Sequence, residues 1–366
     1  MNRSKLILLF IFLVSTVTTV YSYSLTDLNL TLSQNSSILS FQHSLQNLGF
    51  YHRNLSSIIF VLLLVVWIIV YLFLNSKKNL ADINKKSLIF VLVFPLIFSY
   101  SAFLSYDIFN YIFDSKIITQ YGRNPYNFSA LDFPNDPMVH FMRWTHRTYP
   151  YGPIWLIPGI IVTLISTKIL IQIFLFKIIA IISTIFASKL LNSKSDNKNL
   201  LFLFNPLIIT EVLIGNHNDI YVALALIISA VYVANAKIGY LSLIIGGLIK
   251  YANFFMIPSL TIKKFIPKYF SSSLLFLTLL SIFIASIRTE FQIWYIIWVL
   301  PLAYIFPRGH FIRNCIILIS ILLPFSHIPY IQSGSYEGLS FYLKYIIIIS
   351  SLPLSFILYK WHRKLL

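Results

Sequence analysis

Residues 57–75 read SIIFVLLLVVWIIVYLFLN, an apolar run without a single charge. A run of about 20 apolar residues is long enough for an α-helix to cross a bilayer. Strands of a membrane β-barrel would instead alternate apolar and polar residues over about ten positions. Similar runs occur at about 88–106, 169–188, 200–214, 220–236, 238–262, 270–287, 291–306, 311–325 and 339–358. The sequence therefore predicts an all-α, polytopic transmembrane helical bundle of about 11–13 spans.

The composition supports an integral membrane protein. Of the 366 residues, 58% are hydrophobic and 11% are charged, whereas soluble domains carry about 25% charged residues. The net charge of +17 is spread between apolar runs, which is typical of membrane orientation and gives no reason to expect nucleic acid as a partner. The single cysteine, Cys315, excludes an intramolecular disulfide and a thiolate metal cluster. No cofactor or metal is predicted, because no phosphate-binding glycine loop or zinc motif appears.

The lysines and arginines predict the orientation. The first apolar run ends at about Tyr21 and is predicted to be an uncleaved helix, with a signal peptide as the alternative; both place residues 24–56 outside. We expect 153–167 to lie on the outer surface or to dip into it, and 238–262 to be two half-helices turning near Lys250 and Tyr251. The basic clusters then fall on one side, as the positive-inside rule requires: Arg3, Lys5, Lys77, Lys78, Lys85, Lys86, Lys189, Lys194, Lys198, Lys237, Lys263, Lys264, Lys268, Arg308, Arg313, Lys360, Arg363 and Lys364. If 153–167 instead spans fully, Lys189 to Lys198 lie outside.

One membrane domain, 1–366, is expected. Within it we distinguish an N-terminal helical hairpin (1–86), a catalytic module (87–262) with an outer loop (107–168), and C-terminal helices (263–366). An acidic residue at a membrane boundary is costly and is therefore a candidate for function. Asp107 is such a residue, because it ends an apolar run and opens the outer loop.

Residues 107–114, DIFNYIFD, predict the start of a helix on the outer face. Asp107, Asn110, Tyr111 and Asp114 are three, four and seven residues apart, so they share one side of that helix. A negative charge near a helix N-terminus is favoured by the helix dipole. From these residues alone, Asp107 is either a helix cap or a catalytic acid, and both interpretations stay open.

Further polar residues follow on the predicted outer side. Arg143 and Arg147 are of a type that binds phosphate, although lipid-headgroup contact explains them equally well. Glu211 lies within a short span after the Asn205-Pro206 break and needs a partner there. The stretch Gly215 to Asp219, GNHND, offers hydrogen-bonding groups at a membrane edge, but a turn with Asp219 as helix cap is the alternative. Lys250 lies between apolar halves, where it binds an anion or extends to the surface.

These motifs, in this order, resemble a known family. They are DIFNY at 107–111, GRNPY at 122–126, YGP at 151–153, NPL at 205–207 with GNHND at 215–219, and IKY at 249–251. The chain resembles the polytopic GT-C glycosyltransferases, and among them the polyprenol-phosphate-mannose-dependent alpha-mannosyltransferases of lipomannan assembly. The resemblance covers about 107–258, with a weaker tail at 294–301.

The resemblance implies an enzyme with a lipid-linked sugar donor. It is expected in the cytoplasmic (plasma) membrane, with its active site on the extracytoplasmic side. The first acid of the outer loop is the catalytic base in such enzymes, and that position is Asp107, with Asp114 as the candidate second acid. It further implies donor phosphate or sugar binding by Lys250, His217, Asn218 and Asp219. From their own chemistry and place in the sequence we add Arg143, Arg147, Tyr111 and Glu211 as candidates for the same binding. The expected reaction is inverting transfer of a hexose, mannose by resemblance, from a polyprenyl phosphate to a hydroxyl of a glycolipid, glycan or protein.

Two other functions fit parts of the pattern. A transporter or flippase of lipid-linked sugars would use intramembrane charges such as Glu211 and Lys250 together with a broken helix. The large aromatic outer loop and the lack of an internal repeat argue against it. A noncatalytic subunit of a larger glycosylation complex is the third possibility.

Overall fold

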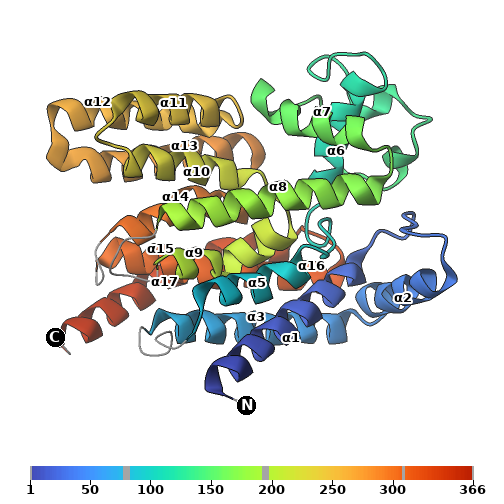
Figure 1. Ribbon diagram of the computed structural model, residues 1–366, viewed down its shortest axis with the longest axis horizontal. Helices are drawn as coiled ribbons and strands as arrows, with labels where there is room; N and C mark the ends of the chain where they lie inside the picture. The colour runs from blue at the N-terminus through green and yellow to red at the C-terminus, as the bar shows by residue number, and fades with distance from the viewer. Residues whose placement is uncertain (1, 77–82, 192–197, 307–309, 365–366) are drawn as a thin grey trace. The chain divides into compact units, whose positions relative to one another are not determined.

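The computed structural model describes residues 2–76, 83–191, 198–306 and 310–364, and the regular elements in these ranges are helices (Figure 1). The all-α prediction is confirmed. Within these ranges, six helices are long and apolar enough to cross a membrane: Arg3–Leu25, Arg53–Asn75, Ile169–Leu190, Pro267–Thr289, Phe311–Ser333 and Phe341–Tyr359. A bent pair, Ile208–Ile214 with Asp219–Val231, counts as a seventh, and Pro153–Ile165, Ala236–Gly247 and Ile293–Ile305 are shorter apolar helices. The expectation of 11–13 spans included such short and half helices.

Several of the basic residues used to predict the orientation lie outside the described ranges: Lys77, Lys78, Lys194 and Arg308. The side chains of Lys198, Lys360, Arg363 and Lys364 are likewise not described. The orientation itself stays a prediction.

The chain forms two compact units, each built from separated segments. Unit 1 consists of Met1–Leu63, Asp82–Ile182 and Glu211–His217, and unit 2 of Leu64–Ala81, Ser183–Thr210 and Asn218–Leu366. Two long helices, α3 (Arg53–Asn75) and α8 (Ile169–Leu190), contribute residues to both. The subdivision at residues 86 and 262 stays a prediction.

In unit 1, α1 (Arg3–Ser22) lies beside α5 (Lys85–Leu96), and the Thr19 hydroxyl donates to the Pro95 carbonyl at 2.9 Å. The expected run 88–106 is not one helix, because α5 ends at Leu96 and turns follow up to residue 106. These turns are apolar for another reason. The Phe103 ring is buried and meets the Tyr21 ring edge-on at 5.3 Å, so the segment fills the protein interior and does not extend a span.

The remaining elements of this part of unit 1 precede the outer loop. They are the short helix η1 (Tyr23–Leu25), α2 (Ser36–Gln46) and the π-helix η2 (Asn47–Tyr51). The Tyr21 hydroxyl donates to the Ser56 carbonyl at 2.7 Å and thereby fixes the end of α1 against the start of α3.

The outer loop begins with α6 (Asp107–Thr119) and ends with α7 (Leu156–Ile165). Between them lie short 3-10 helices, η3 (Ala130–Asp132), η4 (Pro137–His140) and η5 (Pro153–Trp155). Gly159 lets α7 lie directly on α6, since a Cβ there would come within 1.9 Å of the Ser115 hydroxyl. At ten residues, α7 is about half the length of a membrane span.

The loop is held by Asp136, whose side chain is buried. It forms an ion pair with Lys116, accepts a hydrogen bond from the Tyr121 hydroxyl at 2.6 Å, and accepts another from the Met138 backbone N–H at 2.9 Å. Burial opposes ionisation, but these donors and the lysine together hold the pKa of Asp136 below its ordinary value. Asp136 therefore has a structural role in this loop.

Unit 2 contains the remaining helices. After α9 (Lys198–Leu203), the chain breaks at Asn205-Pro206 as predicted and enters the π-helix η6 (Ile208–Ile214), whose last residues belong to unit 1. The elements that follow are α10 (Asp219–Val231), α11 (Ala236–Gly247), η7 (Tyr251–Met256), α12 (Ile257–Phe265), η8 (Pro267–Tyr269), α13 (Phe270–Thr289), η9 (Ile293–Tyr295), α14 (Ile296–Ile305), α15 (Phe311–Leu322), η10 (Leu323–His327), α16 (Ile328–Ser333) and α17 (Leu339–Lys364).

The predicted break near Lys250 is confirmed. Helix α11 ends at Gly247, η7 begins at Tyr251, and Lys250 has extended backbone between them. Gly247 permits the reversal, because a Cβ there would lie 2.5 Å from the Phe254 ring. Figure 1 shows α10, α11, α12 and α13 side by side within this unit.

Candidate active site

Asp107 is the first residue of α6 and does not cap it. The cap position is Tyr106, which makes no side-chain capping bond, and the Asp107 backbone N–H donates to the Ser105 hydroxyl at 3.4 Å. Asp107 is only 7% exposed. The capping interpretation is therefore wrong, since the carboxylate lies in the first turn, where the dipole favours its charge, and is directed at a histidine.

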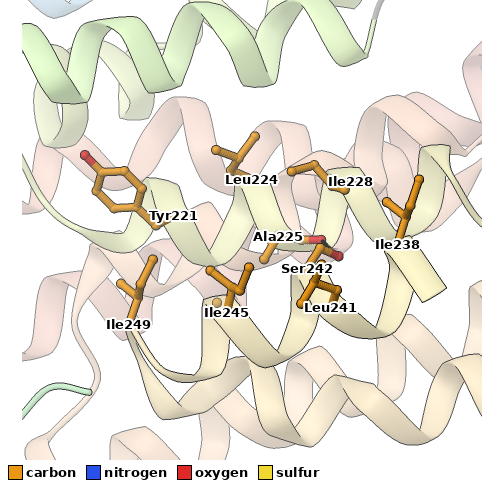
Figure 2. A pocket seen from close by; sticks show the side chains of 10 residues that line it. Tyr221, Leu224, Ala225, Ile228, Ile238, Leu241, Ser242, Ile245 and Ile249 are labelled. Carbon is orange, nitrogen blue, oxygen red and sulfur yellow. Dashed lines mark hydrogen bonds between the residues drawn. The ribbon is translucent and has the colours of Figure 1, made fainter. Parts of the chain in front are cut away.

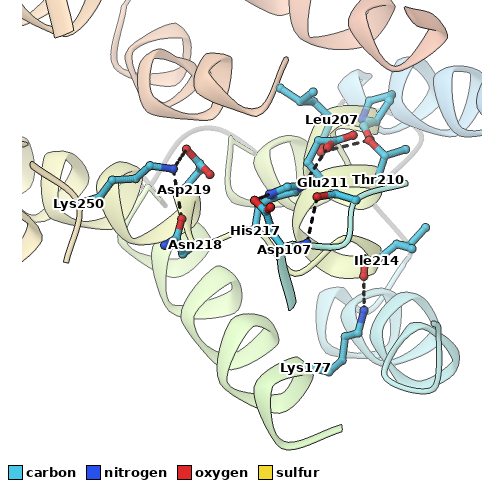
Figure 3. A network of polar contacts seen from close by, with 12 residues as sticks. Asp107, Lys177, Leu207, Thr210, Glu211, Ile214, His217, Asn218, Asp219 and Lys250 are labelled. Carbon is cyan, nitrogen blue, oxygen red and sulfur yellow. Dashed lines mark hydrogen bonds and ion pairs between the residues drawn. The ribbon is translucent and has the colours of Figure 1, made fainter. Parts of the chain in front are cut away.

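That histidine is His217, and it lies between two acids. Its Nδ1 is 3.5 Å from an Asp107 carboxylate oxygen, and its Nε2 is 3.5 Å from a Glu211 carboxylate oxygen (Figure 3). His217 and Glu211 are each 1% exposed. His217 is therefore a partner of Glu211, the acid for which the sequence indicated that one is needed. We call Asp107, His217 and Glu211 the acid–histidine cluster; all three belong to unit 1.

Local backbone structure brings His217 back onto Glu211. The π-helix η6 carries Glu211, and Asn216 adopts a left-handed conformation with φ of 62°. Asparagine tolerates this conformation better than most residues. The turn lets the His217 backbone N–H donate to the Glu211 carbonyl at 3.0 Å.

Lys177 stabilises the backbone just before this turn, a role that the sequence does not reveal. Its ammonium donates to the carbonyls of Leu213 (3.0 Å) and Ile214, and to the Ser99 hydroxyl at 3.1 Å. The side chain is fully buried. Lys177 therefore binds the carbonyl end of η6 just before the His217 turn.

Asp114 and Arg147 add charge near Asp107. The Arg147 guanidinium stacks over the rings of Trp144 (5.6 Å) and Tyr151 (5.9 Å). Burial lowers the pKa of Arg147, but the Tyr151 hydroxyl and the carboxylates of Asp107 and Asp114 raise it more. The pKa of Arg147 therefore lies above its ordinary value. Burial raises the pKa of Asp114 to about 7; the charge of Arg147 opposes this rise and that of Asp107 adds to it.

The pKa of Asp114 predicts a pH-dependent stability. The pKa of Asp114 in the folded protein is about 7, above the ordinary 3.8. The folded protein therefore holds this proton more tightly than the unfolded chain does. The resulting contribution to the free energy of unfolding is fully present below about pH 4 and is lost as the pH rises through 7. Between pH 5 and pH 8 we expect a loss of about 2 to 3 kcal/mol. Asp114→Asn should remove this loss and be more stable than the parent protein at pH 8.

Thermal unfolding of both proteins in detergent at pH 5 and pH 8 measures the difference. Asp132→Asn is the matched control, because Asp132 is an exposed acid of the same loop and its replacement should keep the parent's pH dependence. A stability gap between parent and Asp114→Asn that is equal at both pH values would contradict the prediction.

The other predicted residues of α6 are buried. Tyr111 is 2% exposed, and its ring meets those of Trp155 (5.3 Å) and Tyr151 (5.6 Å) edge-on. The other side of α6 is buried too, because Phe109 is 0% exposed and packs on Phe141. Asn110 shares the polar side, and its amide donates to the Trp144 carbonyl at 3.4 Å. Helix α6 is therefore surrounded by protein.

Arg143 differs from Arg147 in being exposed. Its guanidinium lies over the Tyr106 ring at 4.9 Å. Phosphate binding by either arginine stays a prediction.

A second polar cluster lies within unit 2 and is centred on Asp219. Lys250 Nζ is 2.8 Å from the Asp219 Oδ1 atom and donates to Asn218 Oδ1 at 3.2 Å (Figure 3). The Trp298 indole N–H donates to the same Asp219 oxygen at 2.5 Å. Asp219 is 0% exposed, while the Lys250 side chain is 15% exposed. We call Asn218, Asp219, Lys250 and Trp298 the lysine cluster.

The lysine cluster changes two sequence interpretations. The N-cap of α10 is Asn218 and not Asp219, so the cap explanation for Asp219 is wrong. Lys250 pairs with a buried carboxylate and does not simply extend to the surface. Trp298 lies in the weaker tail of the resemblance, and its bond to Asp219 has no signal in the sequence, since the two are 79 residues apart.

In the described ranges, no three His, Cys, Asp or Glu side chains are arranged to share one metal ion. Comparison with known proteins identifies the family. Residues 13–264 match the family model described as alpha-(1->6)-mannopyranosyltransferase, N-terminal domain.

The chain belongs to this mannosyltransferase family. It is thus a membrane mannosyltransferase, in agreement with the resemblance to GT-C mannosyltransferases. Neither a curated protein nor a solved structure matches the chain. The matched region of this mannosyltransferase contains both the acid–histidine cluster and three of the four residues of the lysine cluster, with Trp298 beyond it.

Proposed function

We propose that this mannosyltransferase is a GT-C enzyme that moves mannose from a polyprenyl phosphate to an acceptor hydroxyl on the outer face of the plasma membrane. The observation that carries the proposal is the acid–histidine cluster, in which the Asp107 carboxylate is buried against His217. A buried carboxylate with a fixed partner is a suitable general base, because its orientation costs nothing at the moment of reaction.

In the proposed reaction, the acceptor oxygen attacks the anomeric carbon of mannose while Asp107 takes the hydroxyl proton. The bond between the anomeric carbon and the phosphate oxygen breaks, and the configuration inverts. Polyprenyl phosphate leaves as an anion, so it needs positive charge and no strong acid. Lys250 is proposed to supply that charge, with Arg143, Arg147 and His217 as further candidates.

The remaining candidates take supporting roles in this proposal. Glu211 contacts the second nitrogen of His217 and is proposed to fix that ring. Tyr111 is proposed to shape the wall beside Asp107, because its ring is locked between aromatic neighbours. Asn218 and Asp219 would hold the Lys250 ammonium in place.

The test is transfer of labelled mannose by the purified protein in proteoliposomes containing polyprenyl phosphate mannose. Transfer to an added glycan or glycolipid acceptor supports the proposal. Movement of the labelled donor across the bilayer without mannose transfer would favour a flippase, and transfer that needs a second polypeptide would favour a noncatalytic subunit.

A further inference from the structure

An apolar groove lies between α10 and α11 in unit 2. Its volume is about 230 Å³. Helix α10 contributes Tyr221, Leu224 and Ile228, and α11 contributes Ile238, Leu241 and Ile245 (Figure 2). These side chains offer hydrocarbon and one aromatic ring, so the groove suits an apolar ligand.

Small residues form the groove between these larger side chains. A Cβ on Gly246 would lie 2.6 Å from the Ala225 Cβ, so glycine is what lets the two helices approach here. The Ser242 hydroxyl donates to the carbonyls of Gly239 (2.9 Å) and Ala225 (3.2 Å). Because this hydroxyl already donates its hydrogen bond within the helix pair, a ligand in the groove need not accept one from it.

One end of the groove lies at the end of the helix pair that is next in sequence to the lysine cluster. Figure 2 shows Tyr221 and Ile249 together at that end, with Ile228 and Ile238 at the other. Lys250 directly follows Ile249, and its ammonium contacts Asn218 and Asp219 at the start of α10. The Lys250 ammonium therefore lies at the end of the helix pair at which Tyr221 and Ile249 line the groove.

We propose that this groove holds the isoprene units of the donor's polyprenyl chain nearest to the phosphate, with the phosphate at Lys250. The inference rests on the proposed function and adds a location for the lipid. A cation attracts the phosphate, and burial of each methylene group of the chain adds to affinity. A nucleotide sugar lacks the hydrocarbon chain and would leave the groove unused.

Neighbouring isoleucines on α11 give a matched test. Ile245 lines the groove and is 41% exposed, whereas Ile244 does not line it and is 40% exposed. We would measure binding of polyprenyl phosphate to the full chain in nanodiscs, where excess phospholipid is already present. Ile245→Trp fills the groove and should weaken binding about tenfold, the equivalent of about two unburied methylene groups. Ile244→Trp should bind like the parent protein.

A second variant and a second ligand show whether any weaker binding comes from the groove itself. Ile228→Trp fills the same groove from α10 and should also weaken binding. A phosphate ester with a single isoprene unit, too short to lie along the groove, should bind parent and variants equally. Equal weakening by Ile244→Trp, or competition by phospholipid as strong as by polyprenyl phosphate, would overturn the proposal.

The groove and the enzyme function fail in different ways. A parent protein that transfers mannose, with an Ile245→Trp variant that binds and uses the long-chain donor equally well, overturns the groove alone. A parent protein that transfers mannose from no polyprenyl phosphate donor overturns the function, and the groove proposal with it.

Discussion

Asp107→Asn should lower kcat for mannose transfer by about 10²- to 10⁴-fold, the range expected when a general base is removed. The amide matches the carboxylate in size but cannot accept the acceptor's proton. Because the residue is buried against His217, packing should change little. Initial rates in proteoliposomes at saturating donor measure the effect, and thermal unfolding checks that the variant is folded.

Two further variants sharpen this test. Asp132→Asn replaces an exposed acid that accepts from the Ser129 backbone at 2.7 Å, and it should keep the parent's kcat. Glu211→Gln changes the partner of His217 and should slow transfer less than Asp107→Asn does. If kcat with Asp107→Asn stays within about twofold of the parent value, Asp107 is not the base.

Lys250→Met should lower mannose transfer by about 10²- to 10³-fold, because the phosphate loses its cation, and it should also lower stability. The change leaves Asp219 buried with only the Trp298 indole among the bonds of the lysine cluster. Removing one partner of a buried ion pair costs about 3 to 5 kcal/mol, and we expect the lower end because the Lys250 side chain is 15% exposed. Thermal unfolding in detergent gives the stability, and the proteoliposome assay gives the transfer rate.

The double variant Lys250→Met with Asp219→Asn separates structure from chemistry. Stability should return because no uncompensated charge remains, while transfer should stay about 10²- to 10³-fold reduced because the phosphate has lost its cation. Lys344→Met is the control, since Lys344 also pairs with a carboxylate, that of Glu290. A stable double variant with parental transfer would show that Lys250 only neutralises Asp219.

The sequence predicted the membrane class, the helix beginning at Asp107, and the breaks at Asn205-Pro206 and near Lys250. Each of these follows from local chemistry. Long uncharged runs require helices in a bilayer because backbone groups there must bond internally, and both breaks lie beside proline or glycine, which are the residues least favourable in a helix interior. The prediction of a single helix over 88–106 was wrong, because a segment packed inside the protein is as apolar as one that faces lipid.

The partners of the charged residues were decided by the tertiary structure alone. The sequence indicated that Glu211 and Lys250 each need a partner, because an isolated charge in a membrane is costly. It did not indicate that Glu211 would meet His217 through a left-handed Asn216, or that Asp219 would bind both Lys250 and Trp298. The Asp219 contacts join residues 31 and 79 positions apart and depend on how whole helices pack. The Glu211–His217 contact depends on a π-helix and a left-handed residue, and the sequence pattern predicted neither.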